Sequence, residues 1–228
     1  MSKLSFWLLL TIAALIYGCS QSTNPASSSG IFPLTEGNTW VYQISEFDST
    51  NTLQWSYPDT VTVGKEVIIG TEAWHRIIHS ATDIFSDTIW YSIRTDGLWE
   101  RRYNYSLIPH TYSMAFKYKF PTAINDTFNL SMNKWPPSEP SRSFTRIVST
   151  TELLQVPAGS FSCILYQNNL QPLDSATLQV ISDIIGIEDY INSGIGLIKS
   201  AQSFLRQTGP TTFGHFRHET VLVSYSVH

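Results

Sequence analysis

The chain has few charged residues, and this shortage already limits its class. Asp, Glu, Lys and Arg make up 14% of the 228 residues, against about 25% in typical soluble domains. The net charge is −4, and no cluster of Lys or Arg is longer than Arg101-Arg102, whereas nucleic acid requires a concentrated basic face. We therefore expect no nucleic-acid partner. A surface rich in Ser, Thr and Asn suits an exported β-protein better than a cytosolic enzyme.

Long hydrophobic runs are also lacking. A transmembrane helix needs about 20 apolar residues, and the N-terminal run Phe6–Tyr17 (FWLLLTIAALIY) has twelve. Lys3 supplies a positive charge in front of this run. That length and that flanking charge are typical of a secretory signal sequence and not of a membrane span. We expect residues 1–18 to be a signal peptide.

The end of this segment resembles the lipobox of bacterial lipoproteins. Leu15-Ile16-Tyr17-Gly18-Cys19 places a branched apolar residue three positions before the Cys and a Gly directly before it. In lipoproteins with this signal, the Cys thiol is diacylated, the chain is cut before the Cys and the new amine is acylated. Tyr17 departs from the pattern, because a small residue is usual there. The resemblance implies lipidation of Cys19; the alternative is an ordinary signal cut after Gly18.

A short polar segment follows the Cys. Residues 20–30 (SQSTNPASSSG) contain no large apolar side chain and predict a flexible tether. Its eleven residues can extend to about 35 Å. Ser20, and not Asp, follows the Cys, which in the lipoproteins that this signal resembles is compatible with sorting to the outer membrane. We expect a lipidated Cys and tether at 19–30 and one β-rich domain at 31–228, held at the envelope by the lipid.

Cysteine is scarce, with Cys19 and Cys163 alone in the sequence. If Cys19 carries lipid, Cys163 has no partner within the chain for a disulfide. Cys163 lies in the apolar, strand-like run Phe161–Leu165. We expect a buried and unreactive thiol there.

Apolar residues alternate with polar ones over most of the chain after Ile31, which predicts strands. Asp96-Gly97 separates two aromatic-rich runs and predicts a hairpin turn. Residues 178–187 are the one candidate for a short helix. The predicted fold is all-β: a twisted antiparallel sheet or open half-barrel, with two related β layers as a further option. The expected strands are 39–47, 61–69, 73–80, 88–94, 98–103, 114–120, 127–130, 143–156, 162–168, 196–205 and 216–227.

One short pattern occurs twice. Phe32-Pro33 is followed by Gly37-Asn38-Thr39-Trp40, and Phe120-Pro121 is followed at the same spacing by Asn125-Asp126-Thr127-Phe128. A repeated device of this kind, with a turn that leads into an aromatic-rich strand, predicts two related sub-layers, 31–119 and 120–228. The alternative is coincidence in a chain rich in aromatic and turn residues.

Three motifs in order resemble a family of uncharacterised exported bacterial lipoproteins, related to a domain of unknown function. They are Phe32–Tyr42 (FPLTEGNTWVY), Val156–Phe161 (VPAGSF) and Gly194–Lys199 (GIGLIK). In that family they read FPLxxGNxWxY, VPAGxF and GIGxIK, and the likeness covers most of residues 31–205. The curved-sheet lipoprotein carriers of the periplasm are a looser comparison. The resemblance implies a fold and a location, and no chemistry.

No set of residues predicts catalysis, a cofactor or a metal site. His75 and His79 are about 13 Å apart along a strand, too far to share an ion. Ser131-Met132-Asn133-Lys134 matches the S-x-x-K nucleophile motif, but Trp135-Pro136-Pro137 opposes the helix that this motif requires. We therefore assign no catalytic, cofactor-binding or metal-binding residue.

Aromatic residues are dense between 55 and 135, and they are the one feature that points to binding. Trp55, Trp90, Trp99 and Trp135 form the candidate binding face. Such side chains stack on sugars or line an apolar groove when exposed, and form core or cross-strand pairs when buried.

Together these features predict a membrane-attached, non-enzymatic module that binds or scaffolds an apolar ligand, a glycan or an envelope protein. The alternative is an envelope hydrolase or glycan-active enzyme whose carboxylates converge only in three dimensions. A polar cleft with two carboxylates of perturbed pKa would favour the enzyme. A wide apolar concavity lined by Trp and Tyr would favour the binding module.

Overall fold

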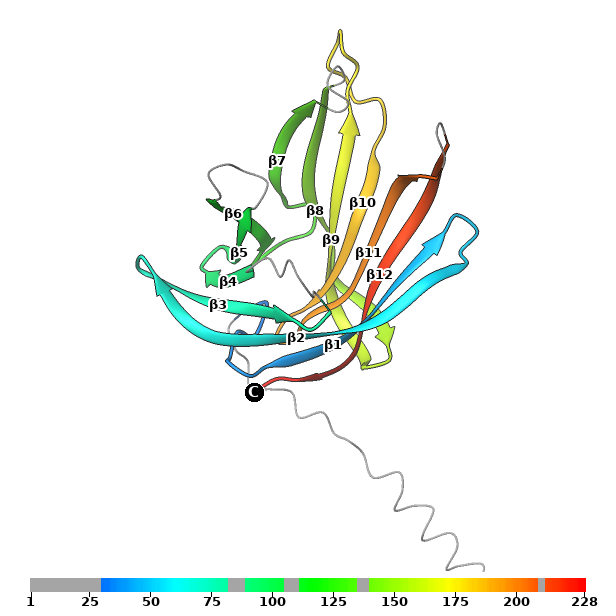
Figure 1. Ribbon diagram of the computed structural model, residues 1–228. Coiled ribbons are helices and arrows are strands. Elements are labelled where there is room, and N and C mark those ends of the chain that lie inside the picture. Colours follow the sequence, from blue (N-terminus) through cyan, green and yellow to red (C-terminus); the bar gives the residue numbers. More distant parts are fainter. Residues whose placement is uncertain (1–29, 82–88, 105–110, 135–139, 209–211) are drawn as a thin grey trace, which may run out of the picture.

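The computed structural model describes residues 30–81, 89–104, 111–134, 140–208 and 212–228, and these form twelve antiparallel strands in one sheet (Figure 1). This confirms the predicted all-β class. The strands are β1 (Thr39–Asp48), β2 (Leu53–Ile69), β3 (Glu72–His79), β4 (Ile89–Arg94), β5 (Gly97–Asn104), β6 (Thr111–Lys119), β7 (Thr127–Lys134), β8 (Pro140–Val156), β9 (Gly159–Pro172), β10 (Ile184–Asn192), β11 (Gly196–Gln207) and β12 (Phe213–Ser226).

The order of strands divides the sheet into two halves. It runs β6-β5-β4-β3-β2-β1-β12-β11-β10-β9-β8-β7, so strands β1–β6 and β7–β12 each form a meander of hairpin-connected neighbours. Pairing of β1 with β12, from Thr39↔Ser226 to Asp48↔Phe216, joins the two meanders in the middle of the sheet. The division that the sequence suggested at 119/120 therefore separates two halves of one continuous sheet.

The sheet curls strongly, and its two edge strands, β6 and β7, come close together (Figure 1). The Asn129 side-chain amide of β7 donates to the Phe116 carbonyl of β6 at 2.6 Å. The Tyr166 hydroxyl of β9 donates to the Lys119 carbonyl at 2.7 Å. The rings of Phe116 and Phe128 lie 5.2 Å apart. Side chains thus join these edges along a seam, and the described residues form no backbone ladder between them, which gives an open half-barrel.

The first half begins with a tight turn before β1. Gly37 has φ 88°, a left-handed conformation that suits glycine. The Asn38 amide donates to the Thr35 carbonyl at 3.1 Å. The turn is tied to β2, because the Gly37 amide donates to the Val63 carbonyl and the Val63 amide donates to the Asn38 carbonyl, both at 2.9 Å.

The second half begins with the same turn before β7. Asn125 has φ 70°, and Asn tolerates this region better than most residues. The Asp126 amide donates to the Ala123 carbonyl at 3.1 Å. The Asn125 amide donates to the Ile147 carbonyl at 2.8 Å, and the Ile147 amide donates to the Asp126 carbonyl at 2.9 Å. The two Phe-Pro patterns therefore form matching turns, each with matching hydrogen bonds to the second strand after it, β2 in the first half and β8 in the second.

The first and third motifs meet at one end of the half-barrel. The Phe32 ring lies 4.8 Å from the Trp40 ring, and a Cβ built on Gly196 would lie 2.5 Å from Phe32. The indole of Trp40, which is fully buried, donates to the Ile195 carbonyl at 2.7 Å. Gly196 is therefore required for close approach as well as for its φ of 98°.

The second motif joins the same end. It forms the turn between β8 and β9, and the Ala158 amide donates to the Leu222 carbonyl of β12 at 3.4 Å. Phe161 is buried, and its ring lies 6.1 Å from that of Tyr225. All three motifs thus build the closed end of the half-barrel and its hydrophobic core.

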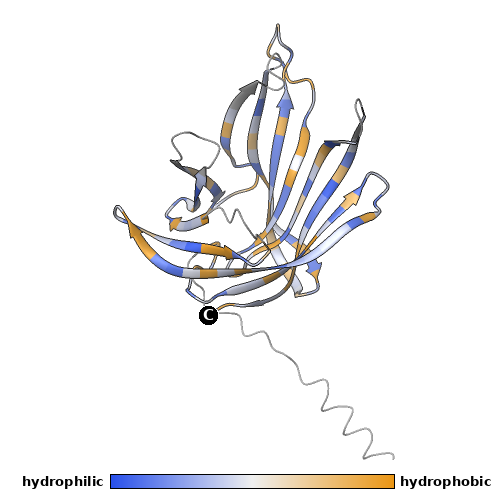
Figure 2. Ribbon diagram, viewed as in Figure 1, coloured by the Kyte–Doolittle hydropathy of each residue, from blue (hydrophilic) through white to orange (hydrophobic). Residues whose placement is uncertain are grey.

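Hydropathy alternates along the long strands, as Figure 2 shows, and side chains on the inner face form the core. Cys163 is among them, at 1% exposure. Burial, and to a smaller extent the charge of the nearby Glu152, raises the pKa of the Cys163 thiol to about 11.

One expectation about the secondary structure was wrong. Residues 178–187 form no helix, because Leu178 has φ 57° in the connection after β9 and Ile184 begins β10.

No helix within the described ranges has the length and apolarity needed to cross a bilayer.

Candidate binding groove

The inside of the half-barrel holds a cavity of about 420 Å³, a size in the range of small-molecule sites. Side chains of nine strands reach it, because residues at alternate positions point to the same face of a strand. Most of its lining is aromatic or aliphatic: Phe32, Tyr42, Ile44, Tyr57, Val61, Ile77, Ala81, Ile89, Tyr91, Tyr118, Ile187 and Leu197. We call this space the groove.

A second compartment of about 230 Å³ extends the groove toward the seam. Lys117, Tyr118, Ile187 and Asp189 line both spaces. The compartment continues past Tyr166, which lies on β9 near the seam. The two spaces together form an elongated site with Ile187 at their junction.

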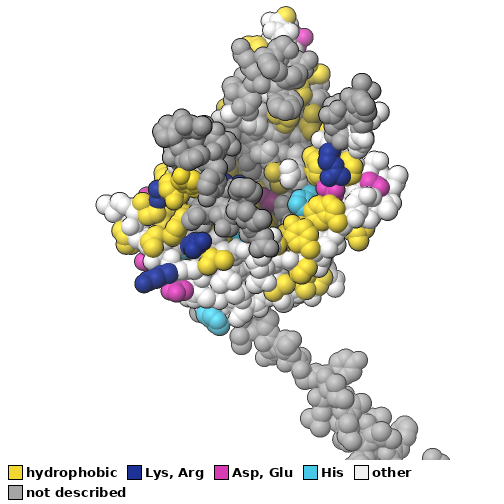
Figure 3. Space-filling view, viewed as in Figure 1, with side chains coloured by type: hydrophobic (Ala, Val, Ile, Leu, Met, Phe, Trp, Pro, Cys, Tyr) yellow, Lys and Arg dark blue, Asp and Glu magenta, His cyan; other side chains and the backbone are white. Residues whose placement is uncertain are grey.

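The opposite end of the groove has an aromatic rim. The Trp55 and Tyr57 rings stack with centroids 5.4 Å apart, and Trp55 makes an edge contact with His218 at 5.3 Å. Nearby, the Arg206 guanidinium lies 3.9 Å from the Phe216 ring and pairs with Glu46 at 2.9 Å. Figure 3 shows hydrophobic side chains gathered with a histidine and a cation at the mouth of the groove, near β12 and the β1–β2 hairpin.

A charged network lies on the wall formed by β5 and β6. Glu100 pairs with Lys117 at 2.8 Å and with Arg102 at 3.1 Å. Burial raises the pKa of Glu100, but attraction to Lys117 and Arg102 outweighs burial, and the net pKa is lowered. Burial also opposes the charged form of Lys117, yet Tyr91 and Glu100 keep its pKa above the usual value. Both groups are therefore charged at neutral pH.

Two further carboxylates line the groove, and each has a partner. The Tyr118 hydroxyl donates to Asp189 at 2.9 Å, and burial and the Asp189 charge raise the pKa of Tyr118. Asp59 is 4% exposed and lies 2.7 Å from the Nδ1 of His79. The Ala81 amide also donates to Asp59, at 3.0 Å. The sequence reasoning did not identify these groups, since only the curl of the sheet brings β2, β5, β6 and β10 together.

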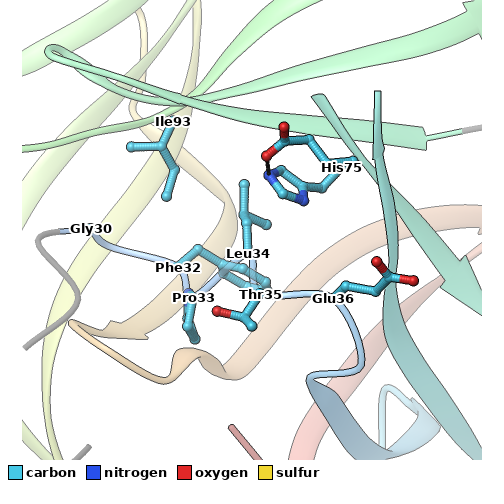
Figure 4. A pocket seen from close by; sticks show the side chains of 9 residues that line it. Gly30, Phe32, Pro33, Leu34, Thr35, Glu36, His75 and Ile93 are labelled. Atoms are coloured by element: carbon cyan, nitrogen blue, oxygen red, sulfur yellow. Dashed lines mark ion pairs between the residues drawn. The ribbon is translucent and has the colours of Figure 1, made fainter. Parts of the chain in front are cut away.

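A separate hollow lies at the closed end, where residues 30–36 cross the sheet (Figure 4). Leu34 points toward the imidazole of His75, which pairs with Glu66 at 3.4 Å. Burial lowers the pKa of His75 against the opposing effect of Glu66. Gly30 and Ile93 lie at one side of this hollow. The hollow therefore marks the place where the segment after the tether joins the domain.

The structure separates the tryptophans of the candidate binding face. Trp55 lies on the rim of the groove. Trp90 and Trp99 are on β4 and β5, and their sequence neighbours Tyr91, Leu98 and Glu100 point inward, so both indoles lie on the outer face. Trp135 lies outside the described residues. The aromatic part of the groove lining consists of Phe32 and four tyrosines, which the sequence did not distinguish from core residues.

The remaining candidates for chemistry stay apart. Ser131 and Lys134 are on the strand β7, and not at the start of a helix. Among the described residues, no group of three or more His, Cys, Asp or Glu side chains could hold a metal ion.

No protein-family model matches the chain, and no curated protein matches it significantly. Similar solved structures include a proposed lipoprotein of Parabacteroides distasonis, with 16% identity over 86% of this chain and 98% of that chain and a TM-score of 0.47. Another is a proposed exported protein of Bacteroides fragilis with a YmcC-like fold, at 13% identity, the same coverages and a TM-score of 0.39. A third is a proposed outer membrane lipoprotein-sorting domain of Vibrio parahaemolyticus, at 9% identity over 84% and 85%, with a TM-score of 0.26. These values are too low for the likeness to carry an argument about function.

Proposed function

We propose that the protein is a lipid-anchored module of the bacterial envelope that binds an apolar or amphiphilic ligand in the groove without changing it chemically. One observation carries the proposal. The groove is lined mainly by aromatic and aliphatic side chains, and its three carboxylates are already paired with protein groups. A lining of this kind gains free energy from apolar surface and does not require a charged ligand.

The energetics are adequate for a chain-like ligand. Each buried CH₂ contributes about 0.8 kcal/mol, so eight such groups contribute about 6 kcal/mol before the costs of binding. The elongated shape, which includes the compartment beside the seam, suits an acyl chain better than a compact ligand. The aromatic rim at Trp55 and Tyr57 is placed to contact the end of the ligand that stays near water.

The anchor belongs to the same proposal. The lipobox-like sequence before Cys19 and the polar tether at 20–30 would hold the domain at a membrane, where amphiphilic ligands are concentrated. The outer membrane is the proposed location.

The hydrolase alternative receives less support from the charges in the groove. A general acid requires a raised pKa, whereas that of Glu100 is lowered by Lys117 and Arg102. Asp59 and Asp189 accept hydrogen bonds from groups of the protein itself. The arrangement stabilises the charged form of Glu100 and leaves all three carboxylates engaged with groups of the protein.

Photolabelling of the lipidated protein in vesicles tests the proposal. The probe is hexadecanoic acid with a terminal diazirine, and the labelled peptides are identified by mass spectrometry. We expect labels on groove-lining segments of β1, β6 and β10. Ile187→Trp fills the junction of the two compartments and should reduce the labelling at least fivefold. Ile185→Trp, on the same strand but outside the lining, is the matched control and should leave it unchanged.

Two results would contradict the proposal. The first is labelling that spreads over the outer face or falls equally in both variants. The second is turnover of an ester or glycan substrate that is abolished by Asp59→Asn or Asp189→Asn, which would favour the hydrolase.

A further inference from the structure

The outer face of strands β3–β6 carries a row of cations and aromatic rings. Arg76 of β3 is opposite Trp90 of β4, and Trp90 is opposite Arg101 of β5. The Arg101 guanidinium lies 3.9 Å from the ring of Tyr112 on β6. These side chains alternate with residues that line the groove, and they therefore point away from it. With Lys65, they form what we call the basic stripe.

Lys65 extends the row on β2. The ladder between β2 and β3 shifts register between Val63 and Glu66, so that Gly64 and Lys65 bulge opposite Arg76. A Cβ built on Gly64 would lie 3.4 Å from the Cβ of Arg76, which shows how closely the bulge approaches this side chain. Lys65 and Arg76 are both exposed.

The three cations of the stripe differ from the other cations of the described residues. Lys65, Arg76 and Arg101 make no ion pair with a described carboxylate, whereas seven other described cations do. Those seven are Arg94, Arg102, Lys117, Lys119, Lys199, Arg206 and Arg217. Arg142 and Arg146 bond to glutamine side chains. In a chain of net charge −4, three cations on one face without a carboxylate partner among the described residues form a local positive patch.

The tether joins the domain at β4, one of the strands that carry the stripe. A Cβ built on Gly30 would lie 2.9 Å from the Ile93 side chain of β4, and Figure 4 shows the two residues at the same side of the hollow. Ile93 is three residues from Trp90, about 10 Å along the strand. Because the two residues are an odd number of positions apart, the side chains of Ile93 and Trp90 point to opposite faces of β4, so the segment that leads to Cys19 starts on the inner side of the strand whose outer side carries the stripe.

We propose that the basic stripe docks on the anionic phospholipid surface of the membrane that holds the anchor. Guanidinium groups bind phosphate oxygens in a bidentate manner, and Trp and Tyr favour the interface between head groups and acyl chains. The exposed Met114 and Ile78, at 54% and 42% exposure, flank the stripe and add apolar contact. The inference rests on the lipid anchor of the proposed function and adds the orientation of the domain on its membrane.

Docking through this surface is strong enough only when the lipid anchor already holds the protein at the membrane. Cations near an anionic membrane contribute about 1 kcal/mol each, so three give about 3 kcal/mol, a Kd of about 6 mM. This is too weak for a free protein. A short flexible linker provides an effective concentration in the millimolar range, and docking then becomes substantial for the anchored protein alone.

Tryptophan quenching tests the docking. The lipidated full-length protein is placed in vesicles of brominated phosphatidylcholine, with or without one third brominated phosphatidylglycerol. We expect at least twofold stronger quenching with phosphatidylglycerol, and loss of this difference at high salt. Arg76→Gln with Arg101→Gln should reduce the difference at least threefold, and Trp90→Phe should reduce it by about half. Lys199→Gln with Arg217→Gln, which removes the same charge from β11 and β12, should leave it unchanged.

The inference is overturned if quenching is equal in the two vesicles, or if both double variants reduce it equally. Binding of a soluble acidic polysaccharide that depends on Arg76 and Arg101, without lipid quenching, would also overturn it in favour of a glycan. Mass spectrometry of the same sample separates the two proposals. A protein without acyl groups contradicts the anchor, whereas an acylated protein without quenching contradicts only the docking.

Discussion

At the closed end, Gly194 and Gly196 of the third motif differ in the space that a side chain would have. Gly194 and Gly196 both have positive φ, 92° and 98°, and a side chain at either position is strained by about 1–3 kcal/mol. A Cβ on Gly194 would meet no atom within 4 Å, whereas a Cβ on Gly196 would meet the Phe32 ring at 2.5 Å. The sequence indicated the turn here, but not that the Phe32 ring covers it.

We therefore expect Gly196→Ala to destabilise the fold by at least about 1 kcal/mol more than Gly194→Ala, because the backbone strain is common to both and the clash is not. Urea unfolding followed by tryptophan fluorescence measures the two free energies. Equal losses would mean that Phe32 moves away at no cost.

At the scale of the element, alternation predicted most strands because one face of each packs on the core. Two regions were missed for physical reasons. The first part of β2 contains Pro58, which a central strand does not tolerate; there β2 pairs with β1 alone, since pairing with β3 begins at Val61. The start of β10 lies in residues 178–187, the one candidate for a short helix; the adjacent Ile184 and Ile185 there do not alternate with polar residues, and both are exposed.

The pair formed by β5 and β6 predicts a pH dependence. The lowered pKa of Glu100 means that its contribution to stability is complete above the unfolded pKa and is lost as the pH falls through the lowered folded pKa. The raised pKa of Lys117 means that its contribution is complete below about pH 10 and is lost as the pH rises further.

Glu100→Gln should thus cost about 2 kcal/mol at pH 7, because it leaves the charge of Lys117 inside the groove with less compensation. The variant should also lose less stability than the parent between pH 5 and 3. Glu72→Gln breaks the more exposed pair with Arg94 and is the control, with an expected cost below about 1 kcal/mol. Urea unfolding as a function of pH measures both effects, and equal costs would contradict the expectation.

At the scale of the whole molecule, the groove could not be predicted from the sequence. Tyr91 and Glu100 are opposite each other in a local hairpin, but Asp189 is far from both in the chain, and its approach to them depends on the curl of the sheet and on the order of the two halves. The repeated Phe-Pro pattern indicated two halves, because its turn residues are local. It contained no information about which strands join them.

The proposed attachment of the whole molecule to the membrane depends on one residue, Cys19. Cys19→Ser removes the sulfur that would carry the diacylglycerol, so incorporation of labelled palmitate by producing cells should fall to background. Cys163→Ser is the matched control and should keep full incorporation, since that thiol is buried at 1% exposure. Palmitate labelling that persists in Cys19→Ser would exclude Cys19 as the sole acylated residue.

The pairing of β1 with β12 has a consequence for the order of folding during the proposed export. The middle of the sheet consists of the first and the last strand of the chain. Until β12 has emerged, β1 lacks one of its two neighbours, Trp40 has no cross-strand partner at Tyr225, and the two meanders are not joined. Completion of the fold therefore waits until the residues of β12 are available, and during the proposed export the preceding strands remain unjoined and able to pass through a translocation channel.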